Sequence, residues 1–457
     1  MPSQKSDEKI RQRLGRFVYH CSLESIPTKV IEKGKTSLIN GIGIGISCYD
    51  TESAKMARRL AKSESGTSRR NGATIFCDGS KVSLLSAAFA NSCLFHSRAQ
   101  EDTLGTTHAG TIIIPAALVV AEKNGNSGKE VLEAIIAGYE IAGTLDRNLS
   151  AFTTPRGFRA STIFGIIGCA ATASKLLKLS EEQTINALGF AASFAGGTLE
   201  CFAAGTMEWR FGVGVASREG IGCALIAAEG GMSAPLAFEG KAGYLNALAN
   251  TQQNSQNIGK ELGKVWEILN AGFKPYAACA FNQTPITVML DLVRKSKIDY
   301  KKIAHIDVRM SPYEANYPGM ASKGSFFSVG GTLMSTPFML ALACVENNIT
   351  LAGESQFDEP RILGLIKKTD VIADDSMPRY SAGIEITMNN GTKYSKEMKV
   401  EMSYYNFDMP RVIKLVKSIA AETGVSQVKV NKMISLVRKM DKLPNVRELT
   451  QLLGSCP

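Results

Sequence analysis

Residues 127–145 read SGKEVLEAIIAGYEIAGTL. Ser127 and Glu130 have the spacing of a capping box, in which a hydroxyl and a carboxylate satisfy free N–H groups at the start of a helix. An apolar run from Val131 to Leu145 follows directly. The segment therefore predicts a helix that begins at Ser127 and is buried on most sides.

Similar helix-forming patterns occur on both sides of this segment. Ser180 and Gln183 repeat the capping-box spacing before another apolar run, and residues 165–173 and 187–197 are rich in Ala and Gly, which lets helix backbones approach closely. Residues 41–45, GIGIG, lack the spacing of a dinucleotide-binding loop and predict a close-packed helix instead. Residues 1–270 are therefore predicted to form one large all-helical domain.

The pattern changes near Lys274. Apolar residues alternate with polar ones over 302–310 and again over 384–388, and the second run leads into Asn390-Gly391, a strong hairpin signal. Helical runs lie between them, so residues 271–403 predict a smaller α+β domain, and the amphipathic tail 404–457 is expected to pack back on the helical domain. The predicted fold class is mainly α with a smaller α+β lid.

Composition excludes several classes of protein. The 457 residues exceed the usual size of one hydrophobic core, and the ten cysteines show neither metal-ligand spacing nor a disulfide framework. The net charge of +10 is spread along the chain without a nucleic-acid-binding motif. Neither a signal peptide nor an apolar run of the roughly 20 residues that a membrane span needs is evident. We expect a soluble cytoplasmic protein that binds no nucleic acid, membrane or metal.

Two of the four histidines lie in residues 91–122, NSCLFHSRAQEDTLGTTHAGTIIIPAALVVAE. His96 ends a helix-like segment, and His108 lies in a polar turn before an apolar helix that we expect to open with Pro115 near its first turn. A loop histidine beside a buried helix suits a catalytic base, although a structural role is equally compatible with this segment alone.

Several segments together resemble the MmgE/PrpD family, which includes 2-methylcitrate dehydratases, cis-aconitate decarboxylases and an iminodisuccinate epimerase. The resemblance rests on 26–30, 96–108 with 115–117, 138–140, 162–179, 189–197, 209–211, 274–276 and 317–319, in family order. It implies a helical domain with an α+β lid, an active site in the cleft between them, a homodimer and no cofactor.

The family's site residues carry over only in part. Thr103, His108, Lys274 and Tyr317 match positions that the resemblance marks as catalytic. Other positions depart from the family pattern: Ala99 replaces an Asp, Arg159 a His, Trp209 a Lys and Gly212 a second His. The predicted pocket has therefore lost groups that titrate near neutral pH.

The family's substrates are small di- and tricarboxylates, whose chemistry begins at a carbon next to a carboxylate. Proton removal there needs a positioned base and fixed positive charge for the resulting anion. We expect substrate contacts from Arg98, Arg159, Arg210, Trp209 and His96, since arginine holds carboxylates by paired hydrogen bonds and Trp209 adds an apolar wall.

Some assignments stay open at this point. Either His108 or Lys274 suits the base, with Tyr317 or the other of the two as acid. Glu101 and Asp102 are possible substitutes for the missing Asp, or else surface partners of basic residues. Cys279 either lines the pocket or is an inert buried thiol. We expect structural roles for His20 and His305.

Three functions fit this sequence. The first is a cofactor-independent lyase that dehydrates or decarboxylates a citrate-like or aconitate-like acid, including alkyl-substituted ones. The second is a dicarboxylate epimerase or isomerase, which needs only two groups to take and return a proton. The third is a divergent paralogue that binds a polycarboxylate or a protein without turnover, because Ala99, Arg159 and Trp209 depart from the family.

Overall fold

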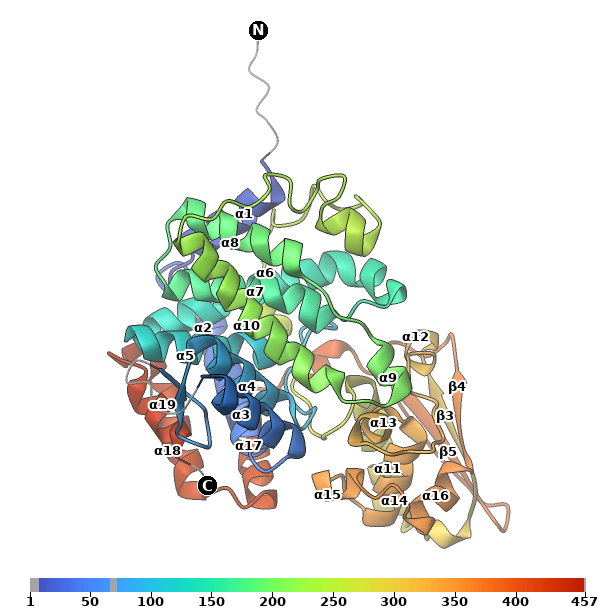
Figure 1. The fold of residues 1–457 in the computed structure, drawn as a ribbon. Coiled ribbons are helices and arrows are strands. Elements are labelled where there is room, and N and C mark those ends of the chain that lie inside the picture. The colour runs from blue at the N-terminus through green and yellow to red at the C-terminus, as the bar shows by residue number, and fades with distance from the viewer. Residues whose placement is uncertain (1–7, 66–71, 456–457) are drawn as a thin grey trace.

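A computed structural model describes residues 8–65 and 72–455. A large helical body holds most of the chain, and a smaller lid with a four-stranded sheet lies against one side of it (Figure 1). The predicted fold class, mainly α with a smaller α+β part, is confirmed. We keep 1–270, 271–403 and 404–457 as the proposed division into domains.

The helical body is built from long helices and one short antiparallel ribbon. The helices are α1 (Ile10–His20), α2 (Thr28–Ile46), α3 (Glu52–Ser65), α4 (Leu84–His96), α5 (Gly110–Asn124), α6 (Gly128–Thr153), α7 (Ala160–Leu176), α8 (Glu181–Phe194), α9 (Glu200–Ala204) and α10 (Glu208–Ala228). The ribbon pairs β1 (Ala73–Thr74) with β2 (Lys81–Val82). Both predicted capping boxes are present, at the starts of α6 and α8.

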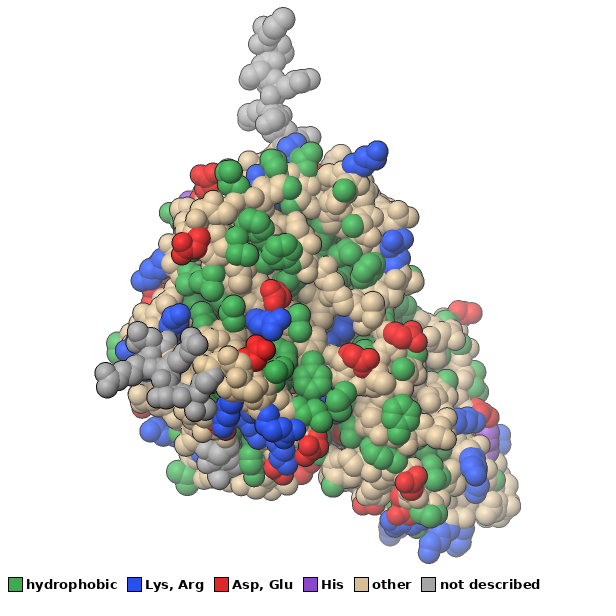
Figure 2. Space-filling view, viewed as in Figure 1, with side chains coloured by type: hydrophobic (Ala, Val, Ile, Leu, Met, Phe, Trp, Pro, Cys, Tyr) green, Lys and Arg blue, Asp and Glu red, His purple; other side chains and the backbone are tan. Residues whose placement is uncertain are grey.

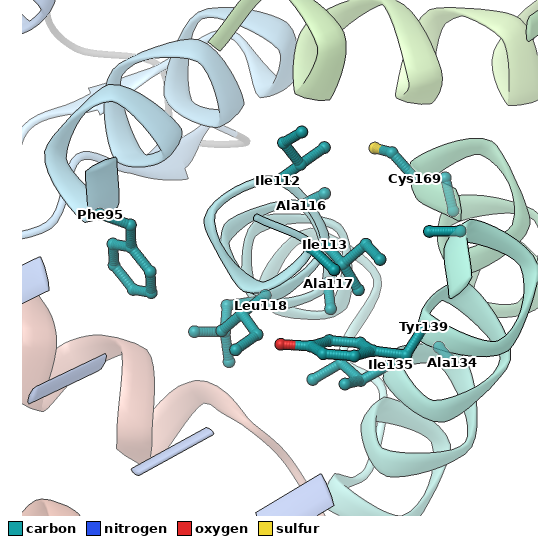
Figure 3. Close-up of a cluster of buried hydrophobic side chains, with 14 of the residues drawn as sticks. Phe95, Ile112, Ile113, Ala116, Ala117, Leu118, Ala134, Ile135, Tyr139 and Cys169 are labelled. Atoms are coloured by element: carbon teal, nitrogen blue, oxygen red, sulfur yellow. The ribbon is translucent and has the colours of Figure 1, made fainter. Parts of the chain in front are cut away.

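Helix α5 lies at the centre of the helical core. Figure 3 shows its apolar side chains facing Phe95 of α4, Tyr139 of α6 and Cys169 of α7. The expected position of Pro115 was wrong: α5 begins at Gly110, so the proline lies in the second turn, inside the helix. The missing N–H is thus an interior one, and the proline removes the hydrogen bond that residue 115 of a helix would donate to the carbonyl of Thr111.

Glycines allow the core helices to approach one another. A Cβ on Gly138 would lie 2.1 Å from Thr172 Oγ1 and 2.8 Å from the Gly168 carbonyl, where α6 crosses α7. A Cβ on Gly43 of α2 would lie 2.3 Å from Val416. The prediction that residues 41–45 form a close-packed helix is confirmed.

The lid packs short helices on one mixed sheet. Its helices are α11 (Gln283–Ser296), α12 (Pro312–Ala315), α13 (Val329–Met334), α14 (Thr336–Glu346), α15 (Leu351–Glu354) and α16 (Pro360–Ile366). Its strands are β3 (Ile303–Met310), β4 (Thr369–Ala373), β5 (Ala382–Met388) and β6 (Lys393–Met398), in the order β4-β3-β5-β6. Only the β3–β4 pair of this sheet is parallel.

The sequence located the main lid elements. Strand β3 covers the alternating run at 302–310, and β5 and β6 form the hairpin whose turn contains Gly391 at φ +83°. That backbone conformation favours glycine and explains the Asn-Gly signal. Helices α11 and α14 contact strands of this sheet.

The chain returns to the helical body after the lid. Helices α17 (Met409–Glu422), α18 (Gln427–Arg438) and α19 (Arg447–Gly454) contribute Val416, Val430 and Leu449 to the same buried cluster as α2 and α5. The C-terminal helices therefore pack on the helical body.

Among the described residues, α10 is the one helix whose length and composition would suit a membrane span. Half of its apolar window is buried in the fold, and the core helix of a soluble protein meets the same test. It contacts α4, α7 and α8.

Candidate active site

A small pocket of about 70 Å³ lies between the helical body and the lid. The loop between α4 and α5, the start of α10 and three lid segments form its walls. Polar lining comes from His96, Glu101, Thr103, Thr106, His108, Lys274 and Tyr317, and apolar lining from Ala99, Phe202, Trp209, Cys279, Ala280, Phe281, Leu333 and Met334. The structure therefore brings together all four residues predicted as catalytic.

Glu101 is the centre of the polar wall. Its carboxylate accepts a 2.7 Å hydrogen bond from Lys274 Nζ and lies 3.2 Å from His108 Nδ1. His96 Nδ1 is also 3.2 Å away, although not aligned as a hydrogen bond. Burial opposes ionisation, but the Lys274 ammonium holds the pKa of Glu101 well below its usual value. This buried side chain is therefore a carboxylate.

His108 has the geometry of a base. Its Nδ1 lies 3.2 Å from both Glu101 Oε1 and the Asp102 carbonyl, which are acceptors, so we infer that Nδ1 carries the hydrogen and Nε2 is free. Burial and the neighbouring Lys274 lower the pKa of His108 well below its usual value. The imidazole is thus neutral at pH 7, and its side chain is 20% exposed, toward the pocket.

Arg159 fixes His96 from behind. Its Nη2 donates to His96 Nε2 at 2.7 Å, which places the histidine hydrogen on Nδ1, toward Glu101. Its Nη1 donates to the Trp209 carbonyl at 2.6 Å. Burial lowers the pKa of His96 to about 4, so this ring is neutral as well. Arg159 does not line the pocket but lies directly behind its wall.

Buried carboxylates hold the loop that carries Thr103 and His108. Asp102 accepts from Tyr139 Oη at 2.5 Å and from the Gly110 N–H at 3.1 Å. Asp146 accepts from both the N–H and the hydroxyl of Thr106. Asp102 thus supports the loop rather than lining the pocket.

Backbone pairing joins this loop to the segment that opens the lid. Thr103 and Gly272 exchange two hydrogen bonds, of 2.9 and 2.8 Å. Gln100 Nε2 donates to the Pro275 carbonyl at 2.7 Å. Lys274 lies between these two contacts, so its ammonium group is held against Glu101.

The lid supplies Tyr317, just after α12. Its ring meets Phe281 edge to face at 5.1 Å, and burial raises the pKa of its hydroxyl. The hydroxyl therefore stays protonated and can donate a proton or a hydrogen bond. Cys279 lines the pocket beside it, with burial raising the pKa of the thiol to about 11.

Two more predicted substrate ligands, like Arg159, do not line the pocket. Arg98 is not in the pocket lining: it binds Gln100 and Glu422, each at 2.5 Å, and Glu422 also accepts from the Leu351 N–H of the lid. Ala99, at φ +53°, turns the chain between Arg98 and Glu101, which is why the two side chains meet different neighbours. We correct its role from substrate contact to a tie between segments.

Arg210 also faces away from the pocket. Adjacent residues on a helix point in different directions, so Trp209 lines the pocket while Arg210 lines a separate cavity with Ser97 and Leu351. Its guanidinium stacks on the Trp209 ring at 4.4 Å. Direct contact with a substrate in this pocket is therefore not supported for Arg210.

Sequence reasoning missed part of the site. It left Glu101 as one of two alternatives and did not name Thr106, Phe202, Phe281 or Met334. No local pattern marks these four, because they reach the pocket from separate segments. The acidic pair Glu101-Asp102 between His96 and His108 was the available signal for Glu101.

One group that could hold a metal ion occurs among the described residues, and it lies outside this pocket. His305, Asp307 and Asp370 come together on strands β3 and β4 of the lid. Lys323 already forms a 2.6 Å ion pair with Asp370 there.

Comparison with known proteins identifies the family to which this chain belongs. Residues 12–257 match the MmgE/PrpD N-terminal domain and residues 276–414 the MmgE/PrpD C-terminal domain. A cis-aconitate decarboxylase of Aspergillus terreus is 22% identical, over 100% of this chain and 99% of the relative. The human cis-aconitate decarboxylase is 22% identical over 97% and 94%, and the cis-aconitate decarboxylase-like protein oryM of Aspergillus oryzae is 23% identical over 88% and 87%. The chain belongs to the MmgE/PrpD family.

Proposed function

We propose that this protein is a cytoplasmic, cofactor-independent lyase that acts on a citrate-like or aconitate-like acid, including alkyl-substituted ones. The observation that carries the proposal is the contact of Glu101 with both His108 and Lys274 in the pocket between body and lid. It combines a neutral base, a fixed carboxylate and an ammonium group within hydrogen-bonding distance, as proton transfer next to a carboxylate requires.

In a dehydration, His108 Nε2 removes the proton from the carbon next to the carboxylate. The imidazolium that forms is stabilised by Glu101, and Lys274 or Tyr317 protonates the departing hydroxyl. Holding a base, an acid and a fixed charge in one dry pocket lowers the barrier because little reorganisation is needed during reaction.

In a decarboxylation, the bond between the leaving carboxylate and its carbon breaks. The electron pair moves into the neighbouring C=C–carboxylate system, and Lys274 or Tyr317 delivers a proton to carbon. The names of the relatives favour this reaction, and neutral His108 then serves to position the substrate.

A dicarboxylate epimerase is the second candidate. His108 comes from the helical body and Tyr317 from the lid, so two proton-transfer groups reach the pocket from different domains. An epimerase needs one group to take a proton and another to return it.

The proposal is tested by NMR of the purified protein in deuterated buffer with citrate, 2-methylcitrate, other 2-alkylcitrates, cis-aconitate and aspartate-derived diacids. Loss of water or carbon dioxide supports the lyase, and His108→Ala should slow dehydration about 100-fold or more, the usual cost of removing a general base. Deuterium exchange at constant mass would instead support the epimerase. If no acid of the panel changes in the NMR spectra but one of them raises the melting temperature, the protein binds the acid without turnover.

The variant Glu101→Gln tests the buried ion pair, and its combination with Lys274→Met separates the effect on catalysis from the effect on stability. It leaves the Lys274 ammonium buried without its carboxylate, so the free energy of unfolding should fall by about 3–5 kcal/mol. The double variant Glu101→Gln/Lys274→Met removes both charges and should recover much of that stability in urea unfolding, yet stay about 100-fold less active than wild type. A single variant with full activity would contradict the central role of Glu101.

The pH profile of dehydration reports on His108. The base works when deprotonated, and burial with Lys274 lowers its pKa below the ordinary 6.5, so the active form persists on the acid side. We expect kcat/KM to hold between neutral pH and 6.5 and to fall only at lower pH. If kcat/KM falls on the acid side with a midpoint at pH 6.5 or above, His108 is not the group that titrates.

We also propose that the protein forms a homodimer through the outer face of α8 and α10. Hydrophobic side chains gather on this face (Figure 2). Phe194 of α8 and Val215 and Ile226 of α10 are exposed, as are Met232 and Leu236 in the segment that follows α10. Large exposed apolar patches usually mark interaction sites. Light scattering should give twice the chain mass of 49.1 kDa, and a monomer at micromolar concentration would refute this pairing.

A further inference from the structure

The charges that line the pocket cancel one another. Lys274 and Glu101 form an ion pair at 2.7 Å, and both histidines are neutral. Within the described part of the chain, no other lining residue carries a charge at neutral pH. A bound acid therefore finds no free positive charge in direct contact.

Arg159 is a buried cation directly behind the polar wall, and a second one, Arg210, stacks on the Trp209 ring. Arg159 is 4% exposed, and its two Nη atoms donate to the neutral acceptors His96 Nε2 and the Trp209 carbonyl. No carboxylate of the described residues forms an ion pair with it. A buried charge without a counter-ion is unfavourable, so Arg159 favours one negative charge nearby in the pocket.

Two buried carboxyl groups next to the loop disfavour a second negative charge in the pocket. The buried side chains of Asp102 and Asp146 hold this loop by hydrogen bonds and do not line the pocket. Burial raises the pKa of Asp102 to about 6, while the hydrogen bonds from Tyr139 and the Gly110 N–H favour its ionised form. A ligand with several carboxylates would add its charge to theirs.

The remaining wall is apolar and is built by both domains. Phe202 and Trp209 come from the helical body, and Phe281, Leu333 and Met334 from the lid. An unpaired carboxylate placed against these side chains loses its water without gaining a partner, whereas a methyl group gains from the same contact.

We propose that the substrate of this site carries two carboxylates rather than three, with an alkyl group against the aromatic wall where a tricarboxylic acid has its third carboxylate. This inference rests on the proposed lyase function. Of the two carboxylates, one stays near Arg159 and accepts the electron pair, while the other leaves as carbon dioxide. The bond to the leaving carboxylate breaks, the pair moves through the C=C bond, and the carbon next to the retained carboxylate takes a proton.

The third carboxylate takes no part in that electron flow. A matched pair of acids isolates it: cis-aconitate, and (E)-3-methylglutaconate, in which a methyl group replaces the central carboxylate. We expect isothermal calorimetry on the wild-type protein to give at least a tenfold lower Kd for the methyl acid. NMR should show its conversion to 3-methylbut-3-enoate and carbon dioxide, with a higher kcat/KM than cis-aconitate.

Variants of Trp209 test the wall itself. Trp209→Lys places a cation in it and should move the ratio of the two Kd values by at least tenfold toward cis-aconitate. Trp209→Phe keeps the wall apolar and should leave the preference for the methyl acid. Thermal melting of both variants checks that they fold. The ratio of the two Kd values for the wild-type protein tests the inference independently of these variants.

The outcomes separate the two ideas. Equal or tighter binding of cis-aconitate by wild type overturns the two-carboxylate inference, while turnover of either acid still supports the lyase. Preference for the methyl acid without turnover of any acid supports the inference about charge and overturns the lyase. If neither acid binds, both the two-carboxylate inference and the lyase function are overturned.

Discussion

The buried ion pair between Glu101 and Lys274 is the contact on which the site depends. An isolated charge in the interior is strongly unfavourable, so each of these groups requires the other. Because Glu101 belongs to the loop after α4 and Lys274 to the segment that opens the lid, the pair also fixes the two parts of the pocket relative to each other. His96 and His108 are arranged around this pair, and burial keeps both rings neutral.

A second layer of contacts makes that arrangement stable. Asp102 and Asp146 hold the loop from below, Gln100 joins it to Pro275, and Arg98 ties it to Glu422 and through that residue to the lid. These groups do not line the pocket. They determine where the groups that do line it are placed, which is why polar residues in this segment are so deeply buried.

The departures from the family pattern form one consistent change. Ala99 and Trp209 make the wall apolar at the positions where the resemblance implies Asp and Lys, and Arg159 lies behind His96 rather than in the pocket. Glu101, two residues after Ala99, supplies a carboxylate. The site has a neutral imidazole and an ion pair beside a wall that is mostly apolar.

The sequence by itself determined the helices, the hairpin and the fold class, because capping boxes, Ala- and Gly-rich runs and the Asn-Gly turn act over a few neighbouring residues. It also singled out Thr103, His108, Lys274 and Tyr317, on the strength of a family resemblance. Only the tertiary structure decided which charged side chains meet. Arg98, Arg159 and Arg210 look alike in sequence, yet one ties segments together, one lies behind the wall and one faces another cavity. Glu101 gains its importance from Lys274, 173 residues away, and no local pattern encodes a contact of that separation.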